Sequence, residues 1–270
     1  MSKKNTIFAP KFYFGSMKLS SIIKPKVWGS EKWFVFPSAY PLLFKVIDAH
    51  DNLSVQVHPS DSTAEDGHGK TEMWYVTSAQ VGATILTGFN RDTDAREVTD
   101  ALQQDNLLRL TNIVSVHAGD VAYLPAGTIH ALCGGTQVIE IQQNCDVTYR
   151  LYDYNRPDTD GKPRPLHVRE ALKVLDYTRH LQPLTLYDRM AYGAQPLVRD
   201  PHFNTNMLFY DAPVVRDLTA HHNASVYLCA QGEGDINGEH IAPLEAIFIQ
   251  DTHATITPQS PLRLLEVFVP

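Results

Sequence analysis

The sequence predicts a mainly β fold made of many short strands, and two observations indicate it. Prolines and glycines, 17 and 15 in number, are spread along the chain and divide it into short segments. Between them recur runs rich in β-branched and aromatic residues, at 32–37, 42–48, 53–57, 72–77, 82–89, 120–125 and 136–143. Many short strands separated by turns favour a β-sandwich or barrel.

Two segments interrupt this pattern with helical spacing. Residues 95–110 follow Thr93 and Asp94, either of which can cap a helix. Residues 166–177 place their apolar side chains on one stripe at helical spacing. We therefore expect a few helices beside the strands.

A second β-rich region begins after about residue 190. Its strand-like runs are 206–215, 224–238, 244–250 and 262–269, and the stretch QGEGDING (231–238) is typical of a hairpin turn. The order of strands and turns resembles that of the first region. We expect a first β domain over residues 1–185 and a second, smaller β domain over residues 186–270.

Composition narrows the class of protein. The chain has 270 residues, 43% of them apolar and 20% charged, as in an ordinary soluble protein. Its net charge of −7 argues against nucleic acid as a partner, because phosphate backbones attract basic surfaces. No apolar run reaches the roughly 20 residues that a membrane helix needs.

Cysteines and the N-terminus predict the compartment. Cys133, Cys145 and Cys229 lie far apart and form no disulfide framework. The first ten residues, MSKKNTIFAP, lack the apolar core of a signal peptide. We expect a cytoplasmic, reduced protein with no membrane partner.

The segment GDVAYLPAGTIHALCGG (119–135) carries the most informative spacing. Gly119 turns the chain into a strand, Pro125 and Gly127 end that strand, and His130 begins the return strand. This spacing resembles the second sequence motif of the cupin superfamily, whose fold is a double-stranded β-helix, or jelly-roll, that holds a metal. The resemblance implies such a sandwich for the first domain and a cupin-like form for the second. A purely structural histidine is the alternative for His130.

Upstream residues complete a candidate metal site. Gln56 and His58 lie two positions apart, and therefore on the same face of a strand, in LSVQVHP (53–59). Glu72 opens the next run, in GKTEMWYV (69–76). Two imidazoles and two oxygen donors, with His130 as the fourth ligand, suit zinc or another borderline divalent metal. Each residue taken alone also fits a buried, hydrogen-bonded structural role.

The order of the motifs resembles one family. The segments WGS (28–30), 45–61, 69–76, PAGTIHAL (125–132) and 139–156 together resemble type I mannose-6-phosphate isomerase in its short bacterial form. The resemblance implies a zinc-dependent aldose–ketose isomerase that interconverts mannose 6-phosphate and fructose 6-phosphate, an enzyme of carbohydrate metabolism. It also implies a small-molecule sugar phosphate as the ligand. We expect a monomer or a weak homodimer.

The resemblance assigns residues to roles. It implies that Gln56, His58, Glu72 and His130 hold one Zn²⁺ per chain. It implies Arg150, Glu140 and Lys70 as catalytic residues, and Lys45, Ser54 and Arg156 as substrate-binding residues. It implies no metal site in the second domain.

The chemistry explains why such groups are needed. Moving a carbonyl from C1 to C2 passes through a cis-enediol, on whose oxygens negative charge develops. A cation near those oxygens stabilises the charge, and a base moves the proton from C2 to C1. Glu140 or a metal-bound hydroxide could be that base. Lys70 could act on the sugar oxygens or pair with the phosphate.

Two other functions compete with the isomerase. One is a non-catalytic, regulatory cupin that binds a sugar phosphate, which has no need of the set Lys70, Glu140 and Arg150. The other is a cupin oxygenase that uses iron. Gln56 disfavours the oxygenase, because the commoner cupin pattern has a histidine at that position.

Overall fold

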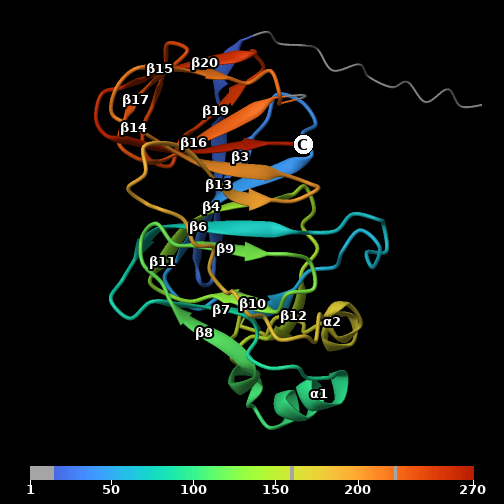
Figure 1. The fold of residues 1–270 in the computed structure, drawn as a ribbon. Helices are drawn as coiled ribbons and strands as arrows, with labels where there is room; N and C mark the ends of the chain where they lie inside the picture. The colour runs from blue at the N-terminus through green and yellow to red at the C-terminus, as the bar shows by residue number, and fades with distance from the viewer. Residues whose placement is uncertain (1–14, 159–160, 222–223) are drawn as a thin grey trace, which may run out of the picture.

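The computed structural model describes residues 15–158, 161–221 and 224–270. The N-terminal residues 1–10, on which the prediction about a signal peptide depends, lie outside the described residues. Among the described residues, four β-sheets stack in layers along the length of the molecule (Figure 1). The mainly β fold predicted from the sequence is therefore confirmed.

The first two sheets come from the N-terminal part of the chain. The first sheet has the strand order β12 (Tyr149–Tyr152), β5 (Val55–Val57), β10 (His130–Leu132), β7 (Thr84–Phe89) and β8 (Thr111–Ser115). The second sheet has the order β2 (Ser20–Lys26), β3 (Gly29–Val35), β4 (Leu42–Ala49), β11 (Thr136–Gln143), β6 (Glu72–Ala79) and β9 (Val121–Leu124).

The other two sheets come mostly from the C-terminal part. The third sheet has the order β1 (Ser16–Lys18), β19 (Ala246–Ile249), β16 (Ser225–Gln231), β21 (Leu262–Phe268), β14 (Asn204–Tyr210) and β13 (Gly193–Arg199). The fourth has the order β15 (Val214–Asp217), β20 (His253–Pro258), β17 (Gly234–Ile236) and β18 (Glu239–Ile241). The strand β1 is the exception, since it pairs with β19 of the distant C-terminal part.

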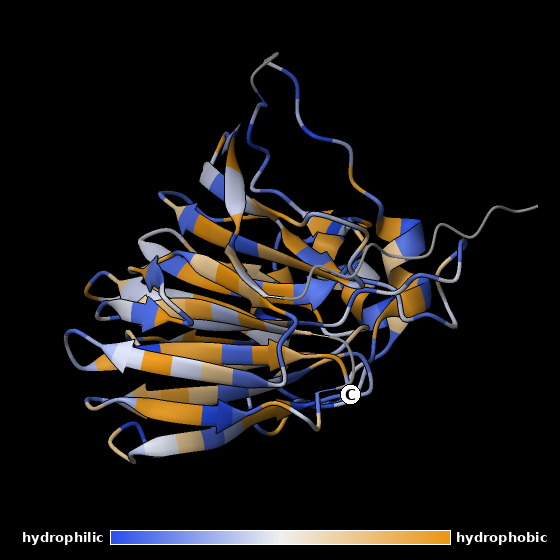
Figure 2. Cartoon of the chain, turned by 90° about the horizontal axis from the view of Figure 1, so that it is seen from above, coloured by the Kyte–Doolittle hydropathy of each residue, from blue (hydrophilic) through white to orange (hydrophobic). Residues whose placement is uncertain are grey.

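Apolar side chains fill the spaces between the layers. Trp74, Ile85 and Leu132 belong to the core between the first and second sheets. A second core joins the second and third sheets, where Phe44 and Phe248 belong to the same cluster. Figure 2 shows apolar and polar residues alternating along many of the strands, as the sandwich prediction requires. Because one core crosses between the N- and C-terminal parts, the two pack as one body.

No helix or strand lies between α2 and β13, in the region of the predicted boundary at 185/186. That connecting segment contacts the N-terminal part, where the Thr185 amide donates to the carbonyl of Val121. The division into domains 1–185 and 186–270 stays a prediction, and β1 is the strand that crosses it.

The helices are shorter than their predicted segments. The helix α1 (Ala95–Gln103) is capped by Asp94, whose side chain accepts a hydrogen bond from the amide of Glu97. It ends before Asp105, whose φ of 53° leaves the helical region, and the 3₁₀ turn η1 (Leu107–Leu110) follows. The helix α2 (Val168–Val174) and α1 lie against the first sheet (Figure 1). Among the described helices, none is both long and apolar enough to cross a membrane.

The stretch QGEGDING contains a hairpin turn only at its last two residues, because residues 234–236 form the strand β17. The strands β17 and β18 pair across a turn at Asn237 and Gly238, whose φ angles are 51° and 84°. Positive φ at both central residues is typical of the type I′ hairpin turn, which favours Asn-Gly.

Candidate metal centre and active-site cavity

The four predicted metal ligands lie on two facing sheets. Gln56 is on β5, His58 follows that strand directly, and His130 begins β10 in the same sheet. The strands β5 and β10 pair so that His130 lies opposite Gln56. Glu72 begins β6 in the second sheet and therefore faces them across the sandwich interior.

A glycine turn brings the histidines together. The amide of Gly127 donates to the carbonyl of His58 over 2.9 Å, three residues before His130. Gly127 has a φ of 89°, and an added Cβ would lie 3.1 Å from the carbonyl oxygen of Val174. The Pro–Ala–Gly corner seen in the sequence is thus a close backbone approach that a larger residue would disturb.

The resulting cluster is compact and buried. The rings of His58 and His130 have centroids 4.9 Å apart. Nε2 of His58 lies 3.5 Å from one oxygen of Glu72, and Nε2 of His130 lies 3.3 Å from the other. One ligand atom from each of the three residues lies within 4.8 Å of the others. These three side chains are 2% exposed or less.

The donor atoms of this cluster fit a divalent cation. Nδ1 of His58 contacts the carbonyl of Val147 at 2.8 Å, and Nδ1 of His130 contacts that of Thr128 at 2.9 Å. If each Nδ1 carries the proton, both Nε2 lone pairs face Glu72. Nε2 of His58 and Oε1 of Glu72 are buried and have no hydrogen-bond partner in the described structure. Acceptor atoms facing one another without a proton are unfavourable in a dry interior, and a cation between them removes that cost.

Burial also favours the protonation state that binds a metal. Burial lowers the pKa of His58 well below its usual value, and the nearby charge of Lys70 lowers it further. Burial lowers the pKa of His130 as well, against the opposing charge of Glu72. Neutral imidazole is the form that coordinates metals.

Gln56 lies beside the cluster. Its Nε2 is 3.2 Å from Nε2 of His130, and its Oε1 accepts a hydrogen bond from the Ser54 hydroxyl at 3.4 Å. Rotating the amide about its last bond would exchange the oxygen and the nitrogen. Either atom is therefore within reach of the cluster, but only the oxygen can be a ligand.

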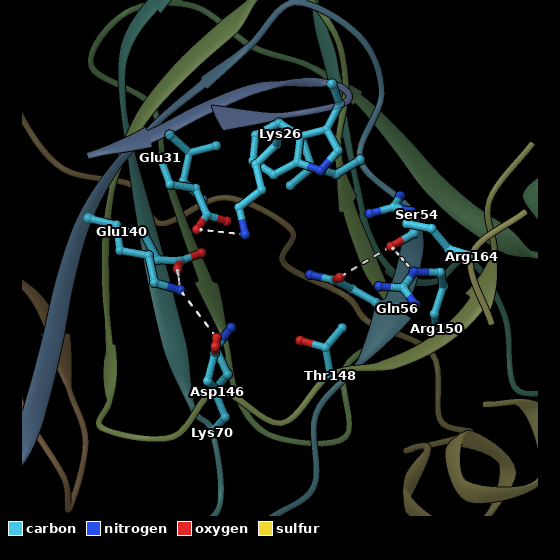
Figure 3. A pocket seen from close by; sticks show the side chains of 14 residues that line it. Lys26, Glu31, Ser54, Gln56, Lys70, Glu140, Asp146, Thr148, Arg150 and Arg164 are labelled. Carbon is cyan, nitrogen blue, oxygen red and sulfur yellow. Dashed lines mark hydrogen bonds and ion pairs between the residues drawn. The ribbon is translucent and has the colours of Figure 1, made fainter. Parts of the chain in front are cut away.

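A polar cavity of about 310 Å³ lies next to the cluster. Figure 3 shows the side chains that line it. It is lined by Lys26, Trp28, Glu31, Lys45, Ile47, Leu53, Ser54, Gln56, Lys70, Glu140, Asp146, Thr148, Arg150 and Arg164. Gln56 and Lys70 connect the cavity to the cluster, since Nζ of Lys70 lies 2.9 Å from Glu72. A cavity of this size and polarity suits a small, polar, charged ligand.

One side of the cavity carries a buried pair of opposite charges. Glu140 on β11 lies opposite Lys45 on β4, and Nζ of Lys45 is 3.1 Å from its carboxylate. The indole of Trp74 donates to the other oxygen of Glu140 at 2.9 Å. The Glu140 side chain is buried and faces the interior of the sandwich.

The charges around Glu140 keep it ionised. Burial alone would raise the pKa of Glu140, but the charges of Lys45 and Lys70 and the indole hydrogen bond outweigh it, so the pKa lies below its usual range. For Lys70, the negative charges of Glu72 and Glu140 outweigh burial and raise its pKa. Both groups are therefore charged at neutral pH.

The opposite side of the cavity carries arginines (Figure 3). Arg150 on β12 lies opposite Gln56, and its Nε donates to the Ser54 hydroxyl at 3.3 Å. Its Nη1 donates to the carbonyl of Pro165 at 2.9 Å. Arg150 was predicted as a catalytic residue and Ser54 as a substrate-binding residue, and both line the cavity.

Arg164 lines the cavity, whereas Arg156 does not. Arg156 donates to Asp51, to the carbonyl of Asn52 and to Asp153. Arg164 forms two hydrogen bonds to the same Asp153, at 2.7 and 2.6 Å. Arg156 is thus linked to the cavity wall only through Asp153, the partner that it shares with Arg164.

Sequence reasoning missed several lining residues. Lys26 and Glu31 come from the β2–β3 hairpin and form an ion pair of 3.3 Å. Asp146 and Thr148 precede Arg150 in the motif 139–156, and Arg164 lies in a loop rich in turn formers. Proximity to Arg150 in the motif could have indicated Asp146 and Thr148, but the loop offered no periodic signal.

Residues 17–98 match the family described as phosphomannose isomerase type I, catalytic domain. The resemblance to type I mannose-6-phosphate isomerases is confirmed. Mannose-6-phosphate isomerase ManA of Bacillus subtilis is 45% identical over 141 residues, which is 51% of this chain and 44% of the relative. Mannose-6-phosphate isomerase of Streptococcus mutans is 44% identical over 143 residues, again 51% of this chain and 44% of the relative. The aligned part of the chain thus spans less than half of these isomerases.

Solved structures of phosphomannose isomerases share the fold. The mannose 6-phosphate isomerase from Bacillus subtilis superimposes with a TM-score of 0.81 at 22% identity, covering 94% of this chain and 100% of the other. A putative mannosephosphate isomerase from Archaeoglobus fulgidus gives 0.75 at 14% identity, covering 97% and 99%. The predicted cupin fold, with a second β part, is therefore that of these isomerases.

Proposed function

We propose that this protein is a metal-dependent aldose–ketose isomerase that interconverts mannose 6-phosphate and fructose 6-phosphate in the cytoplasm. The observation that carries the proposal is one cavity in which Lys70, Glu140 and Arg150 converge next to the His58–Glu72–His130 cluster. A module that only binds a sugar phosphate has no need of an acid–base pair beside a metal site. The relatives named above as mannose-6-phosphate isomerases support the same substrate.

We propose Gln56, His58, Glu72 and His130 as ligands of one Zn²⁺. Two imidazoles and two oxygen donors suit this borderline metal better than hard cations, which prefer oxygen alone. When bound, zinc would act as a Lewis acid that favours negative charge on nearby oxygens. Gln56 is the ligand that reaches from the cluster into the cavity.

The chain's own residues would bind and polarise the sugar. Arg150 stays charged at any working pH and would stabilise the enediolate from one side. Lys70, also positive, would do so from the other side, next to the metal ligand Glu72. Ser54 hydrogen-bonds Arg150 and would contact a sugar hydroxyl.

Glu140 would be the base that carries the proton between C2 and C1. It is ionised, as a base must be, and Lys45 holds it in place. The same low pKa limits its strength as a base, so the acidity of the substrate carbon must be raised by the positive charges around it. Lys45 would position Glu140 and, because it also lines the cavity, would contact the substrate.

Arg164 and Lys26 are the further cations that line the cavity, and we propose that Arg164 contacts the phosphate. A phosphate dianion needs two or three charge-assisted hydrogen bonds to be held firmly. Arg156, predicted from the sequence to bind substrate, would support Arg164 through their shared partner Asp153.

The direct test is turnover of mannose 6-phosphate by the purified protein, coupled to detection of fructose 6-phosphate. We expect turnover with zinc and its loss after a chelator, with recovery when zinc is restored. Metal analysis should give one zinc per chain. A zinc-loaded protein without turnover would contradict the proposed enzyme.

Replacement of Arg150 tests its catalytic role. Arg150→Ala should keep the metal and lose about 100-fold or more of kcat, the usual cost of losing one group that stabilises developing charge. Arg96→Ala, on the exposed face of α1, is the matched control and should behave like the wild type. Equal activity of the two variants would remove Arg150 from the mechanism.

A further inference from the structure

The loop of residues 58–71, between β5 and β6, carries Lys70 and leads directly into Glu72. The side chain of Asp61, which belongs to this loop, fixes the loop's backbone by accepting a hydrogen bond. Oδ1 of Asp61 accepts a hydrogen bond from the amide of Gly69 at 2.7 Å. An added Cβ on Gly69 would lie 2.4 Å from the amide nitrogen of Asp61, so the loop is closed tightly at this point.

Gln143, at the end of β11, extends this hold to the other side of Lys70. Its Nε2 donates to the same oxygen of Asp61 at 3.0 Å. Its Oε1 accepts a hydrogen bond from the amide of Thr71 at 2.8 Å. The amides before and after Lys70 therefore both depend on the position of the Asp61 carboxylate.

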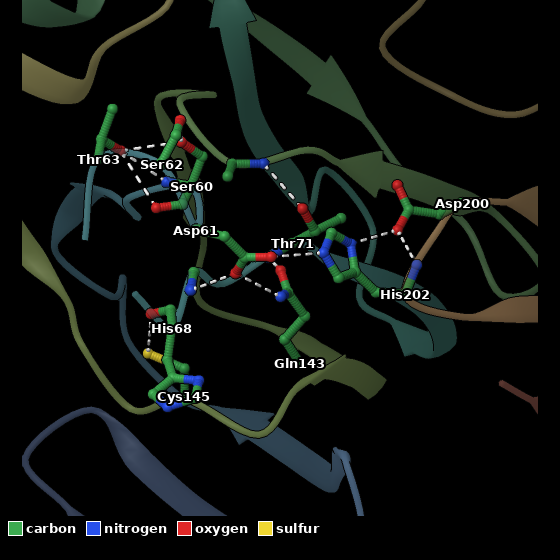
Figure 4. Close-up of polar contacts among 12 residues, drawn as sticks. Ser60, Asp61, Ser62, Thr63, His68, Thr71, Gln143, Cys145, Asp200 and His202 are labelled. Carbon is green, nitrogen blue, oxygen red and sulfur yellow. Dashed lines mark hydrogen bonds and ion pairs between the residues drawn. The ribbon is translucent and has the colours of Figure 1, made fainter. Parts of the chain in front are cut away.

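The other oxygen of Asp61 contacts the C-terminal part of the molecule (Figure 4). Nε2 of His202, in the turn between β13 and β14, lies 2.9 Å from Oδ2 of Asp61. Nδ1 of the same ring lies 2.8 Å from Oδ1 of Asp200. The hydroxyl of Tyr123 on β9 donates to Oδ2 of Asp200 at 2.6 Å. His202 thus lies between two carboxylates that come from different parts of the fold.

Only a protonated imidazole can donate to both carboxylates at once, since the neutral ring has a single N–H. The groups that face His202 are Asp61 and His68 from the loop, Asp200 from its own turn, and Tyr123 behind Asp200. Burial would lower the pKa of His202, but its hydrogen bonds to Asp61 and Asp200 outweigh burial and raise it. The hydrogen bond from Gly69, followed by that from His202, lowers the pKa of Asp61.

We propose that His202 is a positioning residue: as an imidazolium it bridges Asp200 to Asp61 and holds the loop 58–71 in the conformation that presents Lys70 and Glu72. The proposal gives the C-terminal part a role in the active site, and its catalytic readout rests on the proposed isomerase activity. The bridge is present at low pH and is lost as the pH rises through the raised pKa of His202.

His202→Gln tests this bridge, with His240→Gln as the matched control. His240 is another C-terminal histidine beside an aspartate, with Nδ1 3.4 Å from Asp235, on the exposed strand β18. Loss of a group that hydrogen-bonds a metal ligand lowers metal affinity or activity roughly 10- to 100-fold. Loss of the more remote His202 bridge should lower kcat less, by about three- to tenfold. We expect His202→Gln to show this loss, faster zinc release to a chelator, and no decline of kcat on the alkaline side where the wild type declines.

The control should match the wild type in all three measurements. A His202→Gln variant that cannot be distinguished from His240→Gln would overturn the proposal. Zinc release needs no turnover, so it decides the bridge even if the wild type does not isomerise mannose 6-phosphate.

If His202→Gln does not fold, a measurement on the wild type alone still tests the proposal. Amide hydrogen exchange of Gly69 and Thr71 should accelerate, beyond the intrinsic effect of pH, as the pH rises through the titration of His202. The amide of Gln80, which donates to the carbonyl of Gly135 at 2.8 Å, serves as the reference. Constant protection of Gly69 and Thr71 relative to Gln80 would equally overturn the proposal.

Discussion

Two buried glutamates occupy comparable places in the two halves of the molecule. Glu72 lies between the first and second sheets, and Glu266, on β21, lies between the third and fourth. Both have 0% exposure. Their surroundings differ in one respect, namely whether the atoms around the carboxylate donate or accept hydrogen bonds.

Glu266 is surrounded by donors. Arg216 on β15 contacts both of its oxygens, the closest at 2.8 Å. The hydroxyl of Tyr227 donates at 2.8 Å and the amide of Asn206 at 2.6 Å. This carboxylate is satisfied within the protein and has no need of a ligand.

Glu72 faces acceptors. Apart from Lys70, its near neighbours are the Nε2 atoms of His58 and His130, whose other nitrogens contact backbone carbonyls. A buried carboxylate among lone pairs attracts a cation, whereas one among donors stabilises the fold. The surroundings of Glu72 therefore suit a cation, whereas those of Glu266 do not.

The largest effect should come from Glu72→Gln. The substitution keeps the shape but removes the negative charge that balances the cation. We expect zinc content near zero. Loss of a group that only supports a metal ligand lowers activity by up to roughly 100-fold, and loss of a ligand itself should lower it more. Metal analysis and turnover measure both. Full zinc content in this variant would break the contrast between the two glutamates.

Glu266→Gln should have the opposite profile. Removing one partner of a buried ion pair costs about 3–5 kcal/mol, and we expect the lower end because Arg216 is partly exposed. Denaturant unfolding should show this loss. The folded fraction should keep its zinc, and zinc loss in folded protein would show that Glu266 also serves the metal centre.

Tyr227→Phe sharpens the comparison with a smaller change. It removes one of several donors to Glu266, and hydrogen bonds to charged groups contribute about 1.5–3 kcal/mol. We expect about 1.5 kcal/mol less stability, because Arg216 and Asn206 remain. Unfolding curves measure it, with kcat as the control. A stability equal to that of the wild type would mean that this donor is redundant.

The sequence was most informative where chemistry and strand spacing coincide. Gln56 and His58 share a strand face, and the corner at Gly127 aims His130 at the same interior, so local spacing predicted their convergence. Glu72 followed from the motif around it. Their roles as ligands stay a prediction, but the proximity of His58, Glu72 and His130 is a feature of the structure.

Other features depended on contacts that spacing does not encode. Arg156 and Arg164 lie in the same polar region and share Asp153, but only Arg164 lines the cavity, which their sequence context does not indicate. The strand β2 was missed because it contains Pro25 and exposes Ile22 and Ile23, as an edge strand can. The His202 contact joins residues 141 positions apart.

The pairing of β1 with β19 has a consequence for biosynthesis. Ser16 pairs with Ile249, so the first described strand must wait for a partner translated more than 200 residues later. At roughly 5–20 residues per second, the ribosome needs ten seconds or more to supply it. Until then, the nascent N-terminal sandwich exposes the apolar surface that β19 and its neighbours later cover. We expect a chaperone to protect that surface until β19 has been translated and can pair with β1.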